Sequence, residues 1–194
     1  MGRPLEFDRY EVLDRALNVF WRKGYTAASM QDLVVATGIN KASIYNSFGD
    51  KEAFFVAVIE HYIENYSRPH GRLLVETEPA RKAIQQFFDT LVEFLVTDGA
   101  HLGCLLTNIA SEIAPFSEPV EAHVCRVFNM MEGVFLDTIL RGIDDGSIKT
   151  SLPPVAVARM LLNTVQGMRL QSRVRPDEDV FRDIVKITMA MLDC

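Results

Sequence analysis

The segment from Ser29 to Lys51, SMQDLVVATGINKASIYNSFGDK, constrains the fold more than any other part of the chain. Its pattern predicts two short helices joined by a glycine-containing turn and followed at once by a third helix. Ser29 can cap the first helix, and Asp32, three positions later, completes a capping box. Gly38 stands where the chain has to turn, because glycine tolerates the left-handed conformation that ends a helix. Two helices joined by such a short turn form a helix-turn-helix.

The second of these helices, Lys41 to Phe48, is expected to present a polar face to the outside. Asn40 can cap it, while Ile44 and Phe48, four residues apart, point inward. The side chains left outside combine one cation, small groups, an aromatic ring and an amide: Lys41, Ala42, Ser43, Tyr45 and Asn46. Asparagine can bond adenine through two hydrogen bonds and lysine can reach guanine, so this face suits DNA. An ordinary solvated helix has the same composition, so the eight residues alone leave both interpretations open.

A longer set of motifs runs from Ala16 to Phe55. It reads A-L-x-x-F-W-x-x-G-Y, S-M-x-D-L, A-T-G-I, S-I-Y-x-x-F and K-x-x-F-F. In these motifs the chain resembles the TetR-type (TetR/AcrR-like) bacterial transcriptional repressors. The resemblance implies an all-α protein with an N-terminal three-helix DNA-binding domain and a larger helical domain for ligand binding and dimerisation.

The resemblance also assigns residues to the DNA surface. The expected DNA-binding residues are Ser29, Gln31, Lys41, Ala42, Ser43, Tyr45, Asn46 and Lys51. Of these, Ser29, Tyr45 and Lys51 are expected at phosphates. Lys51 also lies at a helix N-terminus, where the backbone amides favour an anion. The recognition helix lacks the arginine that often reads guanine, so the operator sequence is not predictable.

Length and composition agree with a globular chain. Its 194 residues can bury a sizeable core, and 48% of them are hydrophobic. No apolar run reaches the roughly 18 residues of a transmembrane helix, and the N-terminus lacks a signal-peptide core. We therefore expect a cytoplasmic protein with no membrane partner. Three widely spaced cysteines do not predict a disulfide framework.

The net charge of −6 is unusual for a DNA-binding protein, but it is unevenly distributed. Residues 1–55 carry seven Lys/Arg and seven Asp/Glu, whereas residues 56–194 carry thirteen and nineteen. The acidic part is therefore expected to point away from DNA, because phosphates respond to charges within about 10 Å. Arg3, Lys41 and Lys51 are candidate contacts; the segment of Arg3 is either an arm that reaches a phosphate or the minor groove or a disordered tail.

Helical periodicity extends over the rest of the chain without strand-type alternation. The expected helices are Arg9 to Lys23 (capped by Asp8), Lys51 to about Tyr66, Pro79 to Thr97, Cys104 to Ala114, Ser117 or Glu118 to Ile143, Val155 to Val174, and Asp177 to Leu192. Residues 67–71 are expected to break the helix and separate the domains. The predicted domains are 1–55, with the helix from about 51 continuing to 66, and 67–194.

A small, mostly apolar ligand is expected between the helices of the second domain, because ligand sites are apolar with a few polar groups and methionine adapts to varied shapes. The candidate residues are Phe87, Phe88, Leu91, Phe94, Cys104, Leu105, Asn108, Phe128, Met131, Phe135, Asn163 and Met168. Further polar candidates are Glu112, Asn129, Gln166 and Arg169. The same apolar stripe could instead be plain core.

The last two helices carry more apolar residues than one intramolecular face needs. Examples are Met160 and Val165 on one helix and Ile184 on the other. Helix pairs of this kind can form a four-helix bundle between two subunits, as the resemblance also implies. We therefore expect a homodimer that holds two recognition helices about one DNA turn apart or somewhat more.

Two His/Cys pairs allow another interpretation of the regulatory input. Imidazole and thiolate suit zinc or copper(I), so His101 with Cys104 and His123 with Cys125 could sense a metal or react as thiols. Small buried cysteines and exposed histidines would explain the same residues, and we expect no metal site. No phosphate loop, nucleophile elbow or carboxylate pair appears, so we expect neither an enzyme nor a cofactor; a helical enzyme is the remote alternative.

Overall fold

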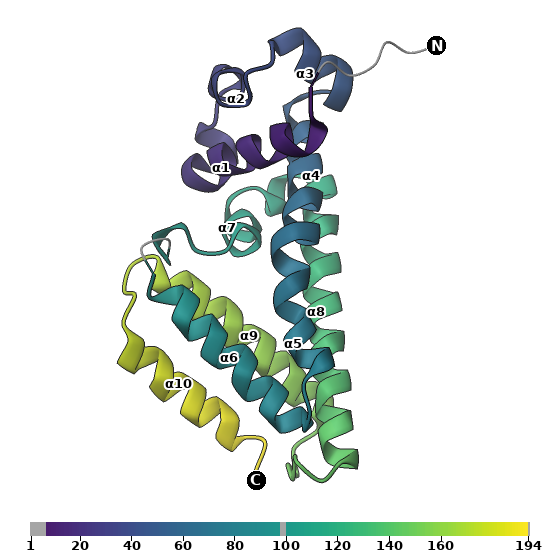
Figure 1. Ribbon diagram of the computed structural model, residues 1–194, viewed down its shortest axis with the longest axis vertical. Coiled ribbons are helices and arrows are strands. Elements are labelled where there is room, and N and C mark those ends of the chain that lie inside the picture. The colour runs from purple at the N-terminus through teal and green to yellow at the C-terminus, as the bar shows by residue number, and fades with distance from the viewer. Residues whose placement is uncertain (1–6, 98–99, 194) are drawn as a thin grey trace. The chain divides into compact units, whose positions relative to one another are not determined.

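The computed structural model describes residues 7–97 and 100–193, and within these ranges all regular structure is helical (Figure 1). The expected all-α fold is therefore confirmed. The described chain divides into two compact units. The first combines the described part of 1–66 with Asn108–Val124, and the second combines Ser67–Thr107 with the described part of 125–194. Arg3, expected in a DNA-contacting arm, lies outside the described residues.

The first unit begins with four helices; the first three start after the caps predicted from sequence, although the first helix extends to Ala27, beyond its predicted end at Lys23. They are α1 (Arg9–Ala27), α2 (Met30–Thr37), α3 (Lys41–Phe48) and α4 (Lys51–Tyr62). Each begins after a side chain that accepts a backbone N–H of its first turn: Asp8, Ser29, Asn40 and Asp50. Gly38 ends α2 in the left-handed conformation, with φ 74°. These devices hold two helices of only eight residues each in the helix-turn-helix.

The core of the first unit is rich in aromatic rings. Phe20 of α1 packs on Phe55 of α4 with 4.7 Å between ring centroids, and Phe48 of α3 packs on Phe54 of α4 at 4.5 Å. Ile44 is fully buried and Phe48 is 8% exposed, which confirms the predicted inward side of α3. The apolar side of α3 is thereby anchored to α4, and its opposite side is left at the surface.

The predicted helix break at residues 67–71 is wrong. After α4 the chain makes a π-helical turn, Ile63–Ser67, and continues into α5 (Arg68–Glu76). Pro69 lies in the first turn of α5, where proline is tolerated because its missing N–H would have no helical partner. The sequence Ser-Arg-Pro-His-Gly therefore starts a helix here and does not interrupt one.

The remaining helices follow the predicted ranges closely. They are α6 (Ala80–Leu95), α7 (Leu105–Glu112), α8 (Glu118–Asp144), α9 (Pro154–Ser172) and α10 (Glu178–Ala190). Short 3₁₀ turns occupy Ala100–Leu102 and Ala114–Phe116. The division between the units falls inside both α7 and α8, so each of these helices contributes residues to both units.

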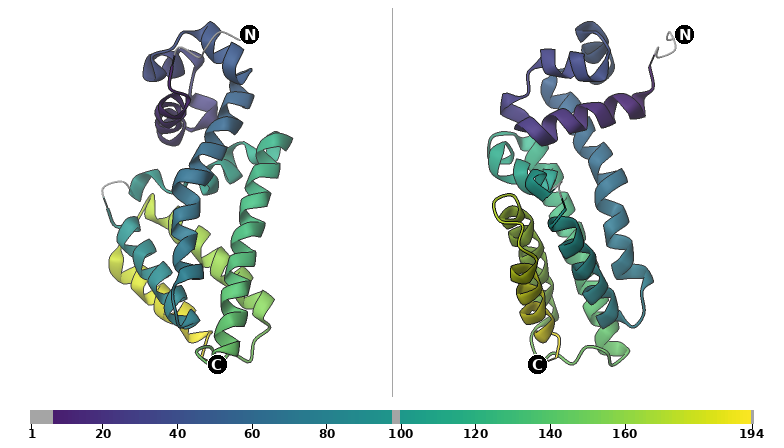
Figure 2. Two further views of the ribbon diagram at one scale, coloured as in Figure 1. Left: turned by 45° about the vertical axis from the view of Figure 1, so that its right-hand side comes forward. Right: turned by 60° about the vertical axis from the view of Figure 1, so that its left-hand side comes forward.

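The core of the second unit lies among α6, α9, α10 and the second half of α8, with α6 next to α9 and α10 (Figures 1 and 2). Phe87, Phe88 and Phe135 cluster at its centre, with 5.3 Å between the centroids of Phe87 and Phe135. Val165, assigned above to the subunit interface, is 1% exposed and belongs to this core. That assignment is corrected because Val165 lies on the α9 face that packs inside its own unit.

Within the described residues, no helix is both long and apolar enough to cross a membrane.

The turn after α2 predicts a measurable cost for any side chain at position 38. Gly38→Ala should lower the free energy of unfolding by about 1–2 kcal/mol, because alanine is strained at positive φ. A steric clash is not the cause, since the nearest atom to an added Cβ would be Nη1 of Arg15, at an ordinary contact distance of 3.7 Å. Urea denaturation checks this value.

Gly133→Ala in α8 is the matched control. No neighbouring atom lies within 4 Å of its would-be Cβ, so alanine should be neutral or stabilising there. Equal effects of the two substitutions would contradict the backbone explanation.

Candidate functional site

The exposed side of α3 carries the side chains expected at DNA. Lys41, Ala42, Tyr45 and Asn46 are exposed, whereas Ser43 is half-buried and its N–H donates to Oδ1 of Asn40 at 2.8 Å. Tyr45 leaves 42% of its surface exposed. The structure thus brings these predicted residues together on one short, rigid helix.

Lys41 and Tyr45 form a pair on this surface. The ammonium of Lys41 lies 5.7 Å from the centroid of the Tyr45 ring, one helical turn further along α3. Such a contact between a cation and a ring holds both side chains in a preferred position. It leaves the ammonium and the phenolic hydroxyl on the outside of the domain, where each can meet a phosphate or a base edge.

The N-terminus of α2 places Gln31 at the surface but engages Ser29 internally. The Ser29 hydroxyl donates to Oδ2 of Asp32 at 2.8 Å and accepts the Asp32 N–H at 3.1 Å. Lys23 donates to Oδ1 of Asp32 at 2.7 Å, and this bond, with those from Ser29, holds the pKa of Asp32 well below its usual range. The capping box therefore uses the hydroxyl that the sequence assigned to a phosphate.

Lys51 is likewise engaged by the protein itself. Its ammonium donates to the carbonyl oxygen of Tyr25 at 2.6 Å and lies 4.3 Å from the centroid of that ring. Burial lowers the pKa of Lys51, and the negative charge of Glu112 acts in the opposite direction. Two further N–H groups of the ammonium can still donate, so a phosphate contact would be shared with a structural one.

The predicted ligand residues of the second unit fall into two groups. Phe87, Phe88, Leu91, Cys104, Leu105, Phe135 and Met168 are buried. Phe128 and Met131 are half-buried, whereas Phe94 and Asn163 are exposed on α6 and α9. Asn108 and Glu112, which the sequence placed beside the ligand, belong to the first unit.

A narrow cavity lies among α6, α7, α8 and α9 of the second unit. Three of the residues predicted to contact a ligand, Phe87, Phe128 and Met131, line this cavity together with the polar pair Gln166 and Arg169. Further lining residues that the ligand prediction omitted are Leu106, Val127, Leu162 and Val165; they share the helical spacing of the predicted ones. Its volume of about 10 Å³ is about that needed by one water molecule, far below the roughly 300 Å³ of a typical ligand site.

The two His/Cys pairs lie in different surroundings. Cys104 is buried and Cys125 is exposed, and His123 contacts Glu60 of α4 with 2.7 Å between Nε2 and Oε1. Among the described residues, no three His, Cys, Asp or Glu side chains are grouped so that they could hold a metal ion. Cys104 instead has Nη1 of Arg169 at 3.4 Å from its sulfur.

Proteins of known identity share both parts of this architecture. Residues 12–58 match the family described as bacterial regulatory proteins, tetR family, and residues 80–188 match the tetracyclin repressor-like C-terminal domain. The HTH-type transcriptional repressor DhaR of Mycobacterium sp. (strain GP1) is 28% identical over 95% of this chain and 91% of its own. The repressor ComR of Escherichia coli (strain K12) is 29% identical over 89% and 82%.

Solved structures agree in fold. A cysteine mutant of the TetR family regulator CifR, complexed with 26-bp double-strand operator DNA, superposes with a TM-score of 0.86 at 28% identity, covering 97% of this chain and 98% of that one. NemR of E. coli in its reduced form gives a TM-score of 0.87 at 20% identity, covering 95% and 96%. The chain belongs to the TetR family of bacterial transcriptional regulators, which are DNA-binding proteins and not enzymes.

Proposed function

We propose that this protein is a dimeric, ligand-responsive transcriptional repressor that binds a near-palindromic operator. The observation that carries the proposal is the outer side of α3, where Lys41, Tyr45 and Asn46 are exposed on a helix anchored by Ile44 and Phe48. The complex of CifR with operator DNA supports the same role for the corresponding helix-turn-helix. Such a protein acts where the DNA is, so we place it in the cytoplasm.

Within this proposal the contacts divide by chemistry. Lys41, Ala42, Ser43 and Asn46 face base edges in the major groove, with Gln31 beside them at the start of α2. Tyr45, Ser29 and Lys51 hold phosphates, which position the protein but do not read sequence. Ser29 and Lys51 also bond within the protein, so we assign them the smaller share of the affinity.

The second unit supplies the response to a small, largely apolar ligand in this proposal. The cavity lined by Phe87, Phe128 and Met131, with Gln166 and Arg169, is its site, and helices around it have to separate to admit the ligand. A ligand that binds the separated state more tightly shifts the protein toward it. If that state cannot span both half-sites, DNA is released, with a coupling of typically about 1–3 kcal/mol. We retain 1–55 as the DNA-binding domain and 67–194 as the ligand-binding and dimerisation domain.

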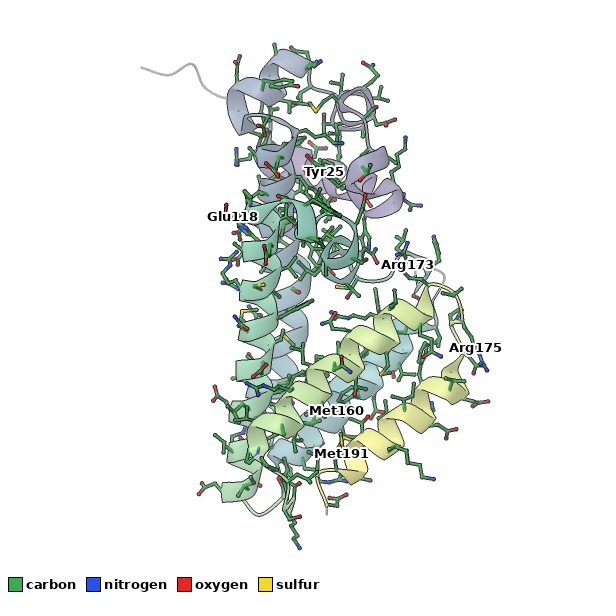
Figure 3. All side chains as sticks on the ribbon, turned by 180° about the vertical axis from the view of Figure 1, so that it is seen from behind. Tyr25, Glu118, Met160, Arg173, Arg175 and Met191 are labelled. Atoms are coloured by element: carbon green, nitrogen blue, oxygen red, sulfur yellow. The ribbon has the colours of Figure 1, made fainter. Side chains whose placement is uncertain are left out.

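An exposed stripe on α9 supports dimerisation through the last two helices. Its residues recur at alternating spacings of four and three: Ala156, Met160, Asn163, Gly167, Leu170 and, just beyond the helix, Val174. This spacing is that of a helix-helix seam. Ile187 of α10 is 70% exposed and adds to the apolar surface, and Figure 3 labels Met160 on α9. Pairing of two such surfaces gives the four-helix bundle.

The DNA-binding role predicts the outcome of a selection experiment. The protein, incubated with a random double-stranded library, should enrich a near-palindromic site whose half-sites lie about one helical turn (roughly 34 Å) apart or somewhat more. Tyr45→Ala should weaken binding to that site by about 1–3 kcal/mol, as measured by gel shift, because a contact to the DNA is lost.

Tyr10→Ala is the matched control for this substitution. Tyr10 is also exposed, and its ring packs against that of His61 on α4 with 4.6 Å between the centroids. The Tyr10→Ala substitution should leave the affinity for the selected DNA site nearly unchanged. A Tyr45→Ala protein with normal circular dichroism and normal affinity would remove Tyr45 from the DNA surface.

The stripe on α9 predicts how the dimer can be broken. Met160→Asp should convert a micromolar dimer into a monomer in sedimentation velocity, because burying an unpaired carboxylate costs about 3–5 kcal/mol. Met160 is 49% exposed in the single chain, so the substitution should spare the core. Val75→Asp, at an apolar position of α5 that is 59% exposed, is the control and should remain dimeric. A monomeric unmodified protein, or a dimeric Met160→Asp variant, would rule out this interface.

A thiol-sensing input is the second candidate, and the Cys104 and Arg169 contact favours it. A positive charge beside a thiol favours the thiolate, which is the nucleophilic and oxidisable form. Cys104 lies at the start of α7, and Arg169 reaches it from α9 while also lining the cavity. The candidate keeps the DNA-binding role and replaces ligand binding by oxidation at Cys104.

Peroxide distinguishes the two inputs. Under thiol sensing, hydrogen peroxide should oxidise Cys104 to the sulfenic acid, release the selected DNA in gel shifts, and be reversed by dithiothreitol. Cys104→Ser should abolish the release, whereas Cys125→Ser, which alters an exposed cysteine, should retain it. Peroxide-insensitive binding by the unmodified protein would exclude Cys104 as the input.

A further inference from the structure

The end of α1 is interrupted at Gly24, which has φ 78° and ψ 169°. Because the helical path breaks there, the N–H groups of Tyr25 and Thr26 need acceptors from outside the helix. The Glu112 carboxylate at the end of α7 supplies both. Its Oε2 accepts the Tyr25 N–H at 3.1 Å and its Oε1 accepts the Thr26 N–H at 2.8 Å. A single carboxylate therefore holds two consecutive peptide groups, both through charge-assisted hydrogen bonds.

The fit between Gly24 and Glu112 is close. A Cβ at position 24 would lie 2.7 Å from Oε2 and 2.9 Å from Oε1 of Glu112. Such distances are shorter than any real Cβ contact, so a side chain at position 24 would push the carboxylate away from the two amides. Gly24 is thus required twice, for its positive φ and for the approach of Glu112.

The peptide group between Tyr25 and Thr26 is also held by α4, through its carbonyl oxygen. The Tyr25 carbonyl accepts a hydrogen bond from the Lys51 ammonium at 2.6 Å, while the Thr26 N–H of the same peptide group donates to Glu112 (Tyr25 is labelled in Figure 3). Lys51 is the first residue of α4 and directly follows the helix-turn-helix. One peptide therefore connects the end of α1, the start of α4 and the end of α7 within the first unit.

The contacts of Tyr25 and Thr26 affect the position of α2, because the chain between Thr26 and the start of α2 is short. Thr26 is followed after two residues by Ser29, the cap of α2, and Ala28 N–H bonds back to the Gly24 carbonyl at 3.3 Å. Any change in direction at Tyr25 and Thr26 therefore changes where α2 begins. Residues 108–124 are also tied to α4, since Ser117 donates to Glu52 and His123 contacts Glu60.

We propose that Glu112 is a positioning residue for DNA binding: by holding the Tyr25 and Thr26 amides it sets the position of α2 and α3, and movement of α7 changes DNA affinity through this contact. α7 is suited to this role because its first residues belong to the second unit, where Thr107 donates to Gln166 at 2.5 Å. Its last residue, Glu112, belongs to the first unit. The proposal rests on the proposed function and names the residue through which regulation acts.

Three variants of the full chain test the contact in graded steps. Glu112→Gln keeps one acceptor but loses the charge and the second acceptor, and Glu112→Ala loses both acceptors. Affinity for the selected DNA should fall about fivefold or more for Glu112→Gln and further for Glu112→Ala. Glu121→Gln, the same change at an exposed position of α8 in the same unit, is the control and should bind as the unmodified protein does.

Hydrogen exchange separates positioning from loss of the fold. Peptides that contain Tyr25 and Thr26 should exchange faster in both Glu112 variants, while peptides from the cores of α4 and α6 should be unchanged. If Glu112→Ala fails to fold, Glu112→Gln decides the question with the same two readouts.

The outcomes are distinct. Faster local exchange with reduced DNA affinity supports the proposal. Variants that bind the selected DNA as tightly as the unmodified protein would overturn it, whether or not local exchange changes, and would leave the proposed function intact. An unmodified protein that selects no DNA would overturn the proposed function itself, and the assigned role of Glu112 with it.

Discussion

The anchoring of α3 to α4 is the interaction on which the DNA-binding unit depends. A helix of eight residues is not stable alone in water, because too few hydrogen bonds offset its nucleation. Ile44 and Phe48 give α3 its stability by burial, and the contact between Phe48 and Phe54 joins it to the helix that follows. Only because this side is fixed can Lys41, Tyr45 and Asn46 be presented in a constant geometry. The outer residues are free to vary in chemistry, since they contribute little to the fold.

Local sequence signals predicted the first unit well. Asp8, Ser29, Asn40 and Asp50 act through hydrogen bonds to amides two or three residues away, so a short window of sequence contains the whole interaction. The inner side of α3 could be predicted for the same reason, because a spacing of four residues defines a helical face. The break expected at 67–71 failed because Pro69 and Gly71 are compatible with the first turn of a helix as well as with a loop.

Contacts between distant segments could not be predicted from such windows. Glu112 was assigned to a ligand site from its place on an apolar helix, yet its carboxylate bonds amides 86 and 87 positions earlier in the chain. Ser29 and Lys51 were assigned to phosphates, and their internal partners depend on tertiary packing. Val165 shows the same effect on α9: helical periodicity identified an apolar stripe, but packing decided which part of it is covered within one chain.

The small size of the cavity in the second unit has a consequence for how a ligand would be recognised. With only about 10 Å³ available, this cavity cannot hold the proposed ligand while the helices are packed, so in the proposed mechanism association would proceed through a minor population in which the helices have separated. The apparent dissociation constant is then the intrinsic one divided by the open fraction. In that mechanism, substitutions that loosen core contacts outside the cavity lining, such as those of Phe181, would raise sensitivity without changing the residues that line the cavity. In the proposed mechanism, core packing would therefore set the threshold of the response separately from the chemistry that selects the molecule.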